Sequence, residues 1–332
     1  MKQIIRLLLS VLASLVLIPE TGTAAEPWTW PGLTPPPAPK PNVEVGVRYW
    51  VSEGQTKFQF DSSGASPILG NPTSVLDYDD IETRSAEFVF RIENEAGTFF
   101  KGFVGGGSVD DGTLDDEDFF AGQIKFSDTL SEVDGDGLFY FSLDVGKTFS
   151  VTRPRGTFSI SPLVGVSFWR ENVIAKGVQC NADDLGGLFC GAPGQVVIPF
   201  GTQVITNEQD WTSLRIGAEA RATLFDKLTL IADVAVLPIA YLDADDSHHL
   251  RTDLGPVPNI RYRGTGHGFQ FEALARYAVT PKFTIGGGVR YWHAETDGEA
   301  EFVHFTNESD LTEYESDRFG VFGELIYQFS FN

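Results

Sequence analysis

The last segment of the chain, residues 318–332, alternates apolar side chains with small or polar ones. Large apolar residues occupy almost every odd-numbered position from Phe319 to Phe331. Because successive side chains of a strand point to opposite faces, this segment has one apolar face and one polar face. Backbone polar groups inside a bilayer must be paired within the protein. A two-faced strand without a long apolar helix elsewhere therefore predicts a closed transmembrane β-barrel.

The beginning of the chain indicates export. Lys2 and Arg6 precede an apolar run over residues 7–18, and small residues follow at 22–25. We therefore predict a secretory signal peptide over residues 1–25, since the apolar run is too short to span a bilayer. Residues 26–41 are rich in proline, which predicts an extended periplasmic lead-in. The barrel domain would then occupy residues 42–332, in the outer membrane of a Gram-negative bacterium.

Ten segments of alternating character follow, an even number as expected of a single-chain bacterial barrel. They centre on residues 43–59, 77–93, 98–109, 136–149, 156–175, 203–224, 228–240, 267–279, 282–295 and 318–331. Short polar turns between them predict the periplasmic end. Longer polar segments predict five extracellular loops, at residues 60–76, 110–135, 176–202, 241–266 and 296–317.

The alternation also assigns charged residues of both signs to the inside of the barrel. These are Arg48, Glu87, Arg91, Asp144, Asp233, Glu272, Arg276, Arg290 and Glu324. Ten strands make a narrow barrel compared with porins of 16–18 strands. We therefore expect a lumen braced by ion pairs rather than an open channel.

The net charge and the cysteine content argue against nucleic-acid binding and against a cysteine metal site. The net charge of −22 disfavours nucleic-acid binding, which normally requires a basic patch. Cys180 and Cys190 lie in one polar segment of an exported chain, which favours a disulfide within that loop. Two cysteines without a nearby histidine do not predict a metal site, and we expect none.

Two of the predicted loops carry residues typical of hydrolytic chemistry. In the second, Asp116 and Asp118 are close enough to share a proton or hold a water molecule, with Asp115 as an alternative member of the pair. In the fourth, Asp246 and His248 are two positions apart, so an extended strand places them on one face. A carboxylate beside an imidazole orients a general base, whereas His249 should face outward. Acid runs are also typical of solvated loops and calcium sites, and exposed loop histidines often have no catalytic role.

At these residues the chain resembles the omptins, ten-stranded outer-membrane proteases of Gram-negative bacteria. Their site combines an Asp-x-Asp pair and an Asp-x-His pair on opposing walls of the barrel rim. Here Asp116–Asp118 and Asp246–His248 are similar to these pairs. Weaker similarities, spread over residues 43–331, occur at residues 74–78, 128–130, 165–170, 260–263 and 277–281. The resemblance implies an endopeptidase in which Asp246 orients His248, His248 activates water, and Asp116 and Asp118 hold that water.

The resemblance also implies lipopolysaccharide as a partner and activator, bound by outward basic residues, with no other cofactor. Arg170 matches one such residue, while Asp210 stands where another base is expected. The family's acidic pocket for a basic P1 side chain is not matched, since its positions hold Ala244 and Phe58. Asp243 or Asp245 could substitute. We expect a monomer that acts on exposed peptides or proteins.

Two interpretations outside proteolysis stay open. An acidic surface antigen, or a barrel that binds ligands or cations, explains the net charge without any catalytic geometry. A lipid-modifying enzyme needs a Ser-His pair on a lipid-facing wall, and no strand places one there. Protease and binding protein differ in one respect. The protease requires His248 and the two aspartates, Asp116 and Asp118, to face one another across a cleft.

Overall fold

The computed structural model describes residues 42–154, 156–305 and 308–330. The predicted signal peptide (residues 1–25) and the lead-in (residues 26–41) lie outside the described residues. Among those residues, no helix combines the length and the apolar character needed to cross a membrane.

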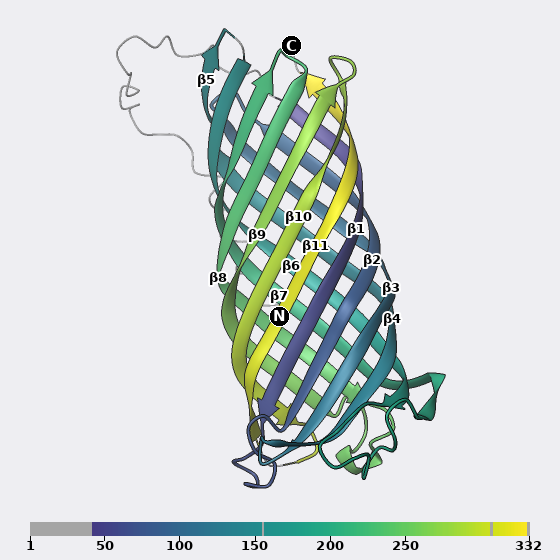
Figure 1. Ribbon diagram of the computed structural model, residues 1–332. Coiled ribbons are helices and arrows are strands. Elements are labelled where there is room, and N and C mark those ends of the chain that lie inside the picture. Colours follow the sequence, from purple (N-terminus) through teal and green to yellow (C-terminus); the bar gives the residue numbers. More distant parts are fainter. Residues whose placement is uncertain (1–41, 155, 306–307, 331–332) are drawn as a thin grey trace.

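The described chain forms eleven strands in one antiparallel sheet (Figure 1). They are β1 (Asn42–Asp61), β2 (Ser74–Glu93), β3 (Thr98–Phe120), β4 (Ile124–Lys147), β5 (Phe149–Arg153), β6 (Gly156–Cys180), β7 (Val196–Leu224), β8 (Leu228–His248), β9 (Ile260–Ala278), β10 (Phe283–Phe302) and β11 (Glu308–Ser330). A 3-10 turn, Thr252–Leu254, precedes β9.

The sheet closes into a ring of ten long strands. Neighbours in the chain pair in sequence, β1 pairs with β11, and β4 pairs with β6. The short β5 follows β4 after Thr148 and pairs with the first residues of β6. The predicted ten-stranded antiparallel barrel is therefore confirmed, with β5 as a local extension at the periplasmic end.

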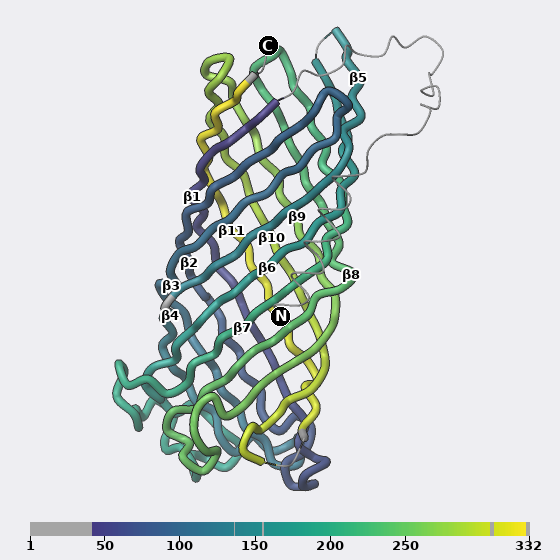
Figure 2. The backbone as a smooth tube through the Cα atoms, turned by 180° about the vertical axis from the view of Figure 1, so that it is seen from behind, coloured from purple at the N-terminus to yellow at the C-terminus, as the bar shows by residue number. Residues whose placement is uncertain are grey.

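The strands continue well past the membrane at the extracellular end, which is the lower end in Figures 1 and 2. Outward apolar residues such as Val51, Phe88, Val236 and Phe319 mark the lipid-facing belt. Beyond this belt the outward side chains are mostly charged. The predicted loop at residues 110–135 is almost entirely strand, since β3 ends at Phe120 and β4 begins at Ile124. The alternation was missed there because both faces of a strand outside the membrane can carry polar residues.

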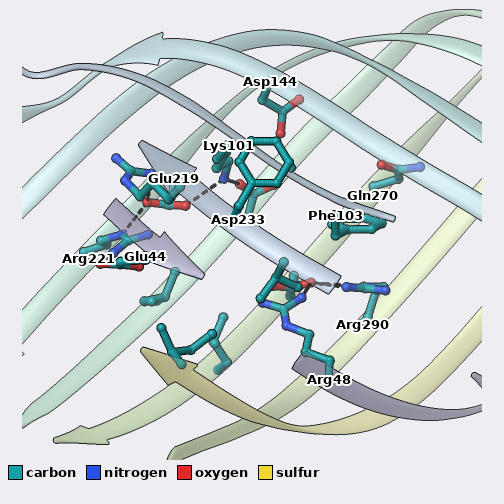
Figure 3. A pocket seen from close by; sticks show the side chains of 18 of the residues that line it. Glu44, Arg48, Lys101, Phe103, Asp144, Glu219, Arg221, Asp233, Gln270 and Arg290 are labelled. Atoms are coloured by element: carbon teal, nitrogen blue, oxygen red, sulfur yellow. Dashed lines mark hydrogen bonds and ion pairs between the residues drawn. The ribbon is translucent and has the colours of Figure 1, made fainter. Parts of the chain in front are cut away.

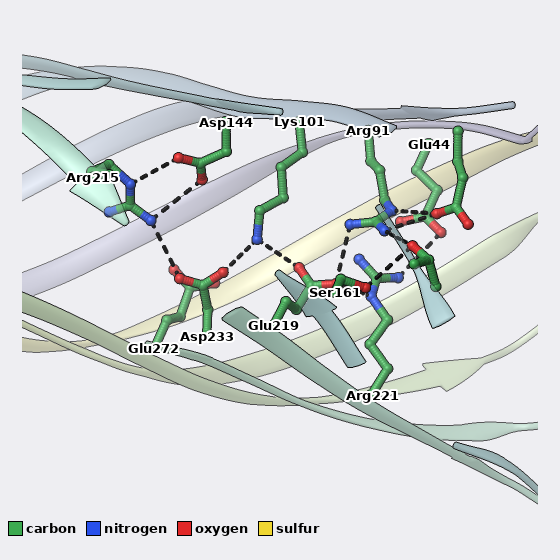
Figure 4. Close-up of polar contacts among 12 residues, drawn as sticks. Glu44, Arg91, Lys101, Asp144, Ser161, Arg215, Glu219, Arg221, Asp233 and Glu272 are labelled. Carbon is green, nitrogen blue, oxygen red and sulfur yellow. Dashed lines mark hydrogen bonds and ion pairs between the residues drawn. The ribbon is translucent and has the colours of Figure 1, made fainter. Parts of the chain in front are cut away.

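The lumen at membrane depth is braced by ion pairs, as the alternation predicted. Arg48 reaches Glu324 at 2.7 Å and Glu272 at 2.9 Å, and Arg290 lies 2.8 Å from Glu272. Figure 4 shows the chain of contacts that continues through Arg215, Asp144, Lys101, Glu219 and Arg91. A cavity of about 80 Å³ lies among these side chains (Figure 3).

Aromatic side chains fill the lumen on the extracellular side of this network. Trp50 packs edge-on against Tyr140 and Trp169, with ring centroids 5.6 and 6.3 Å apart. Further out, Arg318 pairs with Glu171 at 2.5 Å. Phe58 stacks on Tyr314 with centroids 4.8 Å apart. The inside of the barrel is thus packed in layers. The layer that contains Phe58 and Tyr314 lies next to the extracellular mouth, and we call it the aromatic floor.

The predicted disulfide is present. Cys180 ends β6 and is bonded to Cys190 in the β6–β7 connection. It closes a small loop at the extracellular end, away from the barrel wall at membrane depth.

Candidate active site

The end of β8 carries the predicted Asp–His pair on the inner face. Strand alternation turns Leu242, Ala244 and Asp246 inward, and all three are buried. Nε2 of His248 lies 3.1 Å from Oδ2 of Asp246, and the imidazole is 14% exposed. The buried carboxylate therefore holds one edge of a ring whose remaining surface reaches the mouth of the barrel.

Asn259, the residue before β9, fixes the backbone of His248. Its Oδ1 accepts a hydrogen bond from the His248 amide at 2.9 Å, and its Nδ2 donates to the His248 carbonyl at 3.1 Å. Sequence reasoning missed this residue, because an asparagine eleven positions away in a connection carries no signal that it would clamp the histidine.

The acid pair lies on the inner face of β3. Leu114 is buried inside the barrel, so Asp116 and Asp118 share its face, opposite Leu76 and Ser74 of β2. The hydroxyl of Ser74 donates to Oδ1 of Asp116 at 3.5 Å. In the ring of ten, three strands lie between β3 and β8 in one direction and five in the other. The two pairs therefore come from nearly opposite walls.

The charges of the two pairs interact across the mouth. Burial and Asp118 raise the pKa of Asp116 to about 8, while His248 opposes that shift. Burial lowers the pKa of His248, but the Asp246 carboxylate outweighs it, so the pKa lies above its ordinary value. Burial likewise raises the pKa of Asp118. Near neutral pH the raised pKa of Asp116 therefore favours its protonated carboxyl, and the raised pKa of His248 makes its imidazole a stronger base.

The alternative acid, Asp115, faces the outside of β3. It lies with Glu117 and Asp128 in a cluster whose centre is occupied by Lys125. His249 also faces outward, with Nε2 2.9 Å from the Thr206 hydroxyl. Its expected outward position is confirmed.

A layer of tyrosines beneath Asp246 was not predicted from sequence. Tyr78, Tyr262 and Tyr314 come from three different strands and are fully buried. Burial raises the pKa of each hydroxyl, and the Asp246 charge raises it further. Among the described residues, the Tyr78 and Tyr262 hydroxyls, Oδ1 of Asp246 and Nδ2 of Asn207 have no hydrogen-bond partner.

These buried polar groups surround the carboxylate that holds His248. Asn207 is the cross-strand partner of Asp246, and its Oδ1 accepts a hydrogen bond from Tyr314 at 3.2 Å. Buried polar groups are normally satisfied, so this layer has donors available to Asp246. Only the closed ring brings these residues together.

Neither of the two positions discussed above as a pocket for a basic P1 side chain of the substrate holds an acid. Ala244 and Phe58 are both buried in the aromatic floor. The expectation that Asp243 or Asp245 could substitute is wrong. Both point outward because they alternate with Ala244, and they pair with Arg263 at 3.4 Å and Arg261 at 2.7 Å.

Arg170, expected to contact lipopolysaccharide, lies on the outer face of β6. Its Nε is 2.6 Å from Oδ1 of Asp210 on β7, and a second bond joins its Nη2 to Oδ2. The two residues are direct cross-strand partners. The guanidinium thus faces the outside of the barrel but is already engaged by a carboxylate.

The fold and location define the class first. The chain is an outer-membrane β-barrel of ten long antiparallel strands with an acid pair and an Asp–His pair at its extracellular mouth. Residues 45–327 match the model of the family described as Protochlamydia outer membrane protein. The chain therefore belongs to this family. No curated protein matches the sequence.

Among solved structures, the outer membrane protease OmpT from Escherichia coli is similar in fold. The TM-score is 0.68 at 15% identity, over 90% of this chain and 99% of that one. The attachment invasion protein Ail of Yersinia pestis gives a TM-score of 0.29 at 10% identity, over 86% of this chain and 99% of that one. The translocator domain of NalP from Neisseria meningitidis gives 0.33 at 10% identity, over 86% and 88%. The similarity to OmpT concerns the fold alone. The two lower TM-scores are too small to indicate a shared fold.

Proposed function

We propose that this protein is an omptin-like endopeptidase that hydrolyses exposed peptide bonds at the extracellular mouth of its barrel. The observation that supports this most directly is the pairing of a buried Asp246 with His248 at 3.1 Å, electrostatically coupled to Asp116 on the opposite wall. A histidine oriented by a carboxylate is suited to general-base catalysis.

In the proposed reaction, Asp116 and Asp118 position a water molecule beside His248. Nδ1 of the neutral imidazole takes a proton as the water oxygen attacks the peptide carbonyl, because Nε2 donates its own hydrogen to Oδ2 of Asp246. The tetrahedral intermediate then collapses, the C–N bond breaks, and the imidazolium returns the proton to the leaving amine. Asp246 stabilises the imidazolium throughout, as a buried carboxylate does beside a catalytic histidine.

The aromatic floor supports a specificity different from cleavage beside Arg or Lys. A buried cationic P1 side chain needs an acid to offset its desolvation. Ala244 and Phe58 provide none, and Asp243 and Asp245 face outward. We therefore propose that basic P1 residues are not preferred.

The test is cleavage of a randomised fluorogenic peptide library by the refolded barrel with added lipopolysaccharide. We expect wild-type protein to cleave, and the Asp116→Ala/His248→Ala double variant to be inactive. His249→Ala is the matched control, because it removes an adjacent outward imidazole and should retain activity. Absence of cleavage by correctly folded wild-type protein, or cleavage by the double variant, would contradict the proposal. The cleaved sequences report the P1 preference separately.

Lipopolysaccharide binding through Arg170 is proposed as part of this function. Asp210 neutralises the guanidinium in the free protein, so Asp210→Asn should increase the affinity for lipopolysaccharide and Arg170→Ala should decrease it. Equal affinities for both variants would remove Arg170 from the binding surface.

A non-enzymatic binding barrel is the second candidate. The charged exterior of the extracellular extension and the net charge of −22 favour it, since neither requires a catalytic cleft. Absence of peptide cleavage by the folded wild-type protein would support this candidate.

A further inference from the structure

A second cluster of chemically active side chains lies outside the barrel, away from the Asp–His pair. It occupies the outer face of β10 and β11, just beyond the lipid-facing belt. Phe269 packs against His293 with ring centroids 5.3 Å apart, and Phe319 is exposed one step nearer the membrane. Three residues, His293, Glu295 and Glu315, each direct a donor atom into one small volume.

The geometry of this cluster is that of a three-ligand cation site. One donor atom from each of the three side chains lies within 4.8 Å of the other two. Nε2 of His293 is 3.7 Å from Glu295. Glu315 lies 3.6 Å from the other ring nitrogen, Nδ1, so its side chain must turn toward Nε2 to join the same coordination sphere. Tetrahedral zinc, with bonds of about 2.0–2.2 Å, needs donors about 3.3 Å apart. Glu295 and Glu315 are 43% and 37% exposed, so their side chains are free to make that contraction.

The surroundings orient the histidine as a ligand. Nδ1 of His293 is 3.1 Å from Oδ1 of Asp317, which also accepts the hydroxyl of Tyr291. A carboxylate that accepts one ring N–H of a histidine leaves the other nitrogen available to a metal. His267 supplies a second imidazole next to the cluster, since its Nε2 lies 2.9 Å from Glu295. The cluster thus contains nitrogen donors and a supporting carboxylate, not acids alone.

The other acidic cluster on the outer surface differs in this respect. Asp115, Glu117 and Asp128 lie equally close together, but the ammonium of Lys125 is 2.8 Å from Glu117 and also bonds Asp128. A lysine already occupies the place of a cation there. No lysine or arginine forms an ion pair with Glu295, Glu315 or Asp317 among the described residues.

From these contacts we propose that His293, Glu295 and Glu315 form a binding site for a divalent transition metal of the zinc type on the outer wall of the barrel. Imidazole and carboxylate donors suit such metals, whereas calcium and magnesium prefer oxygen ligands alone. His293 and Glu295 belong to β10 and Glu315 to β11. The bound metal would join these strands at the extracellular border of the membrane.

The experiment is calorimetric titration of the folded, detergent-solubilised full barrel with ZnCl₂, after removal of metal by chelation. We expect one high-affinity zinc site per barrel, weakened at least about tenfold in His293→Ala and in Glu315→Gln. His304→Ala is the matched control, because it removes an exposed imidazole elsewhere on the extracellular end. Heat-dependent mobility in electrophoresis establishes that every variant is folded.

Cobalt provides an independent readout of the ligands. Co²⁺ bound at this site should give visible absorption bands that disappear in His293→Ala and persist in His304→Ala. Absence of stoichiometric zinc binding by the wild type, or equal binding by wild type and both site variants, would overturn the proposal. Loss of binding in Glu117→Gln alone would place the metal at the other cluster and also overturn it. None of these outcomes depends on proteolysis.

Discussion

At the scale of single residues, burial has opposite consequences for the acids and the base of the candidate site. It raises the pKa of Asp116 and lowers the pKa of His248, because it disfavours the charged form of each. Asp246 reverses the effect on the histidine. The protonation of the site therefore depends on which charges share the mouth of the barrel.

Replacing Asp246 by asparagine tests how strongly the Asp246 charge controls the pKa of His248. We expect Asp246→Asn to lower the pKa of His248 below its ordinary value, since burial remains while the stabilising carboxylate charge is lost. The chain has five histidines, so NMR titration of the ring protons distinguishes them. An unchanged pKa of His248 would show that Asp246 does not control its charge.

Because the pKa of Asp116 is raised, we expect the free energy of unfolding to depend on pH. Its pKa is raised from 3.8 to about 8 in the folded protein, so the folded state binds more protons than the unfolded state between these values. Its contribution is fully present below pH 3.8 and is lost as the pH rises toward about 8. In Asp116→Asn this loss should be absent. Urea unfolding followed by tryptophan fluorescence between pH 5 and 9 measures it, and an identical pH profile for both proteins would contradict the assignment.

At the scale of elements, alternation along β8 and β3 decides which residues can meet. A strand shifted by one residue would turn Asp246 outward and Asp245 inward. The pairing of Asp246 with Asn207 and Ile260 prevents such a shift. The site is therefore a property of strand register, whereas the β6–β7 connection is held by a covalent bond.

Reduction of Cys180–Cys190 should loosen only that connection. The disulfide closes a loop with a sequence separation of 10, for which the entropic stabilisation is at most about 3 kcal/mol. We expect faster hydrogen exchange and proteolysis within residues 181–195, with the heat-dependent mobility of the barrel preserved. A large loss of barrel stability on reduction would show that the bond supports the wall rather than the connection.

At the scale of the whole molecule, the ion-pair network inside the barrel connects strands that are not neighbours. Arg290 of β10 contacts Glu87 of β2 at 2.5 Å and Glu272 of β9 at 2.8 Å. Its side chain is 1% exposed. The network therefore braces the ring from within by joining strands that are not neighbours in the sheet.

Removing Arg290 takes away the nearer guanidinium of Glu87 and Glu272 and leaves Arg48 as the cation that they share. Arg290→Ala should lower the free energy of unfolding by about 3–5 kcal/mol, the usual cost of breaking a buried pair. Arg251→Ala is the control, because its pair with Asp253 is exposed and should contribute about 0–1 kcal/mol. Equal effects of the two substitutions in urea unfolding would contradict a bracing role for the lumen.

The sequence by itself determined the features that depend on local alternation. Residues 318–332 and the segments like them predicted a ten-stranded barrel, the inward charges and the local disulfide, because a two-residue period directly reports which face meets lipid. The same rule placed Asp246 and His248 on one face. It could not follow β3 and β4 beyond the membrane, where lipid no longer requires an apolar face.

Only the tertiary structure decided which distant residues share the mouth of the barrel. Closure through β4 and β6 places Asp116 opposite His248, and brings Tyr78, Tyr262 and Tyr314 together beneath Asp246. These contacts depend on the number of strands and on their register around the ring. No local pattern in the sequence encodes such cross-barrel neighbours, because each strand's alternation is satisfied whatever lies on the opposite wall.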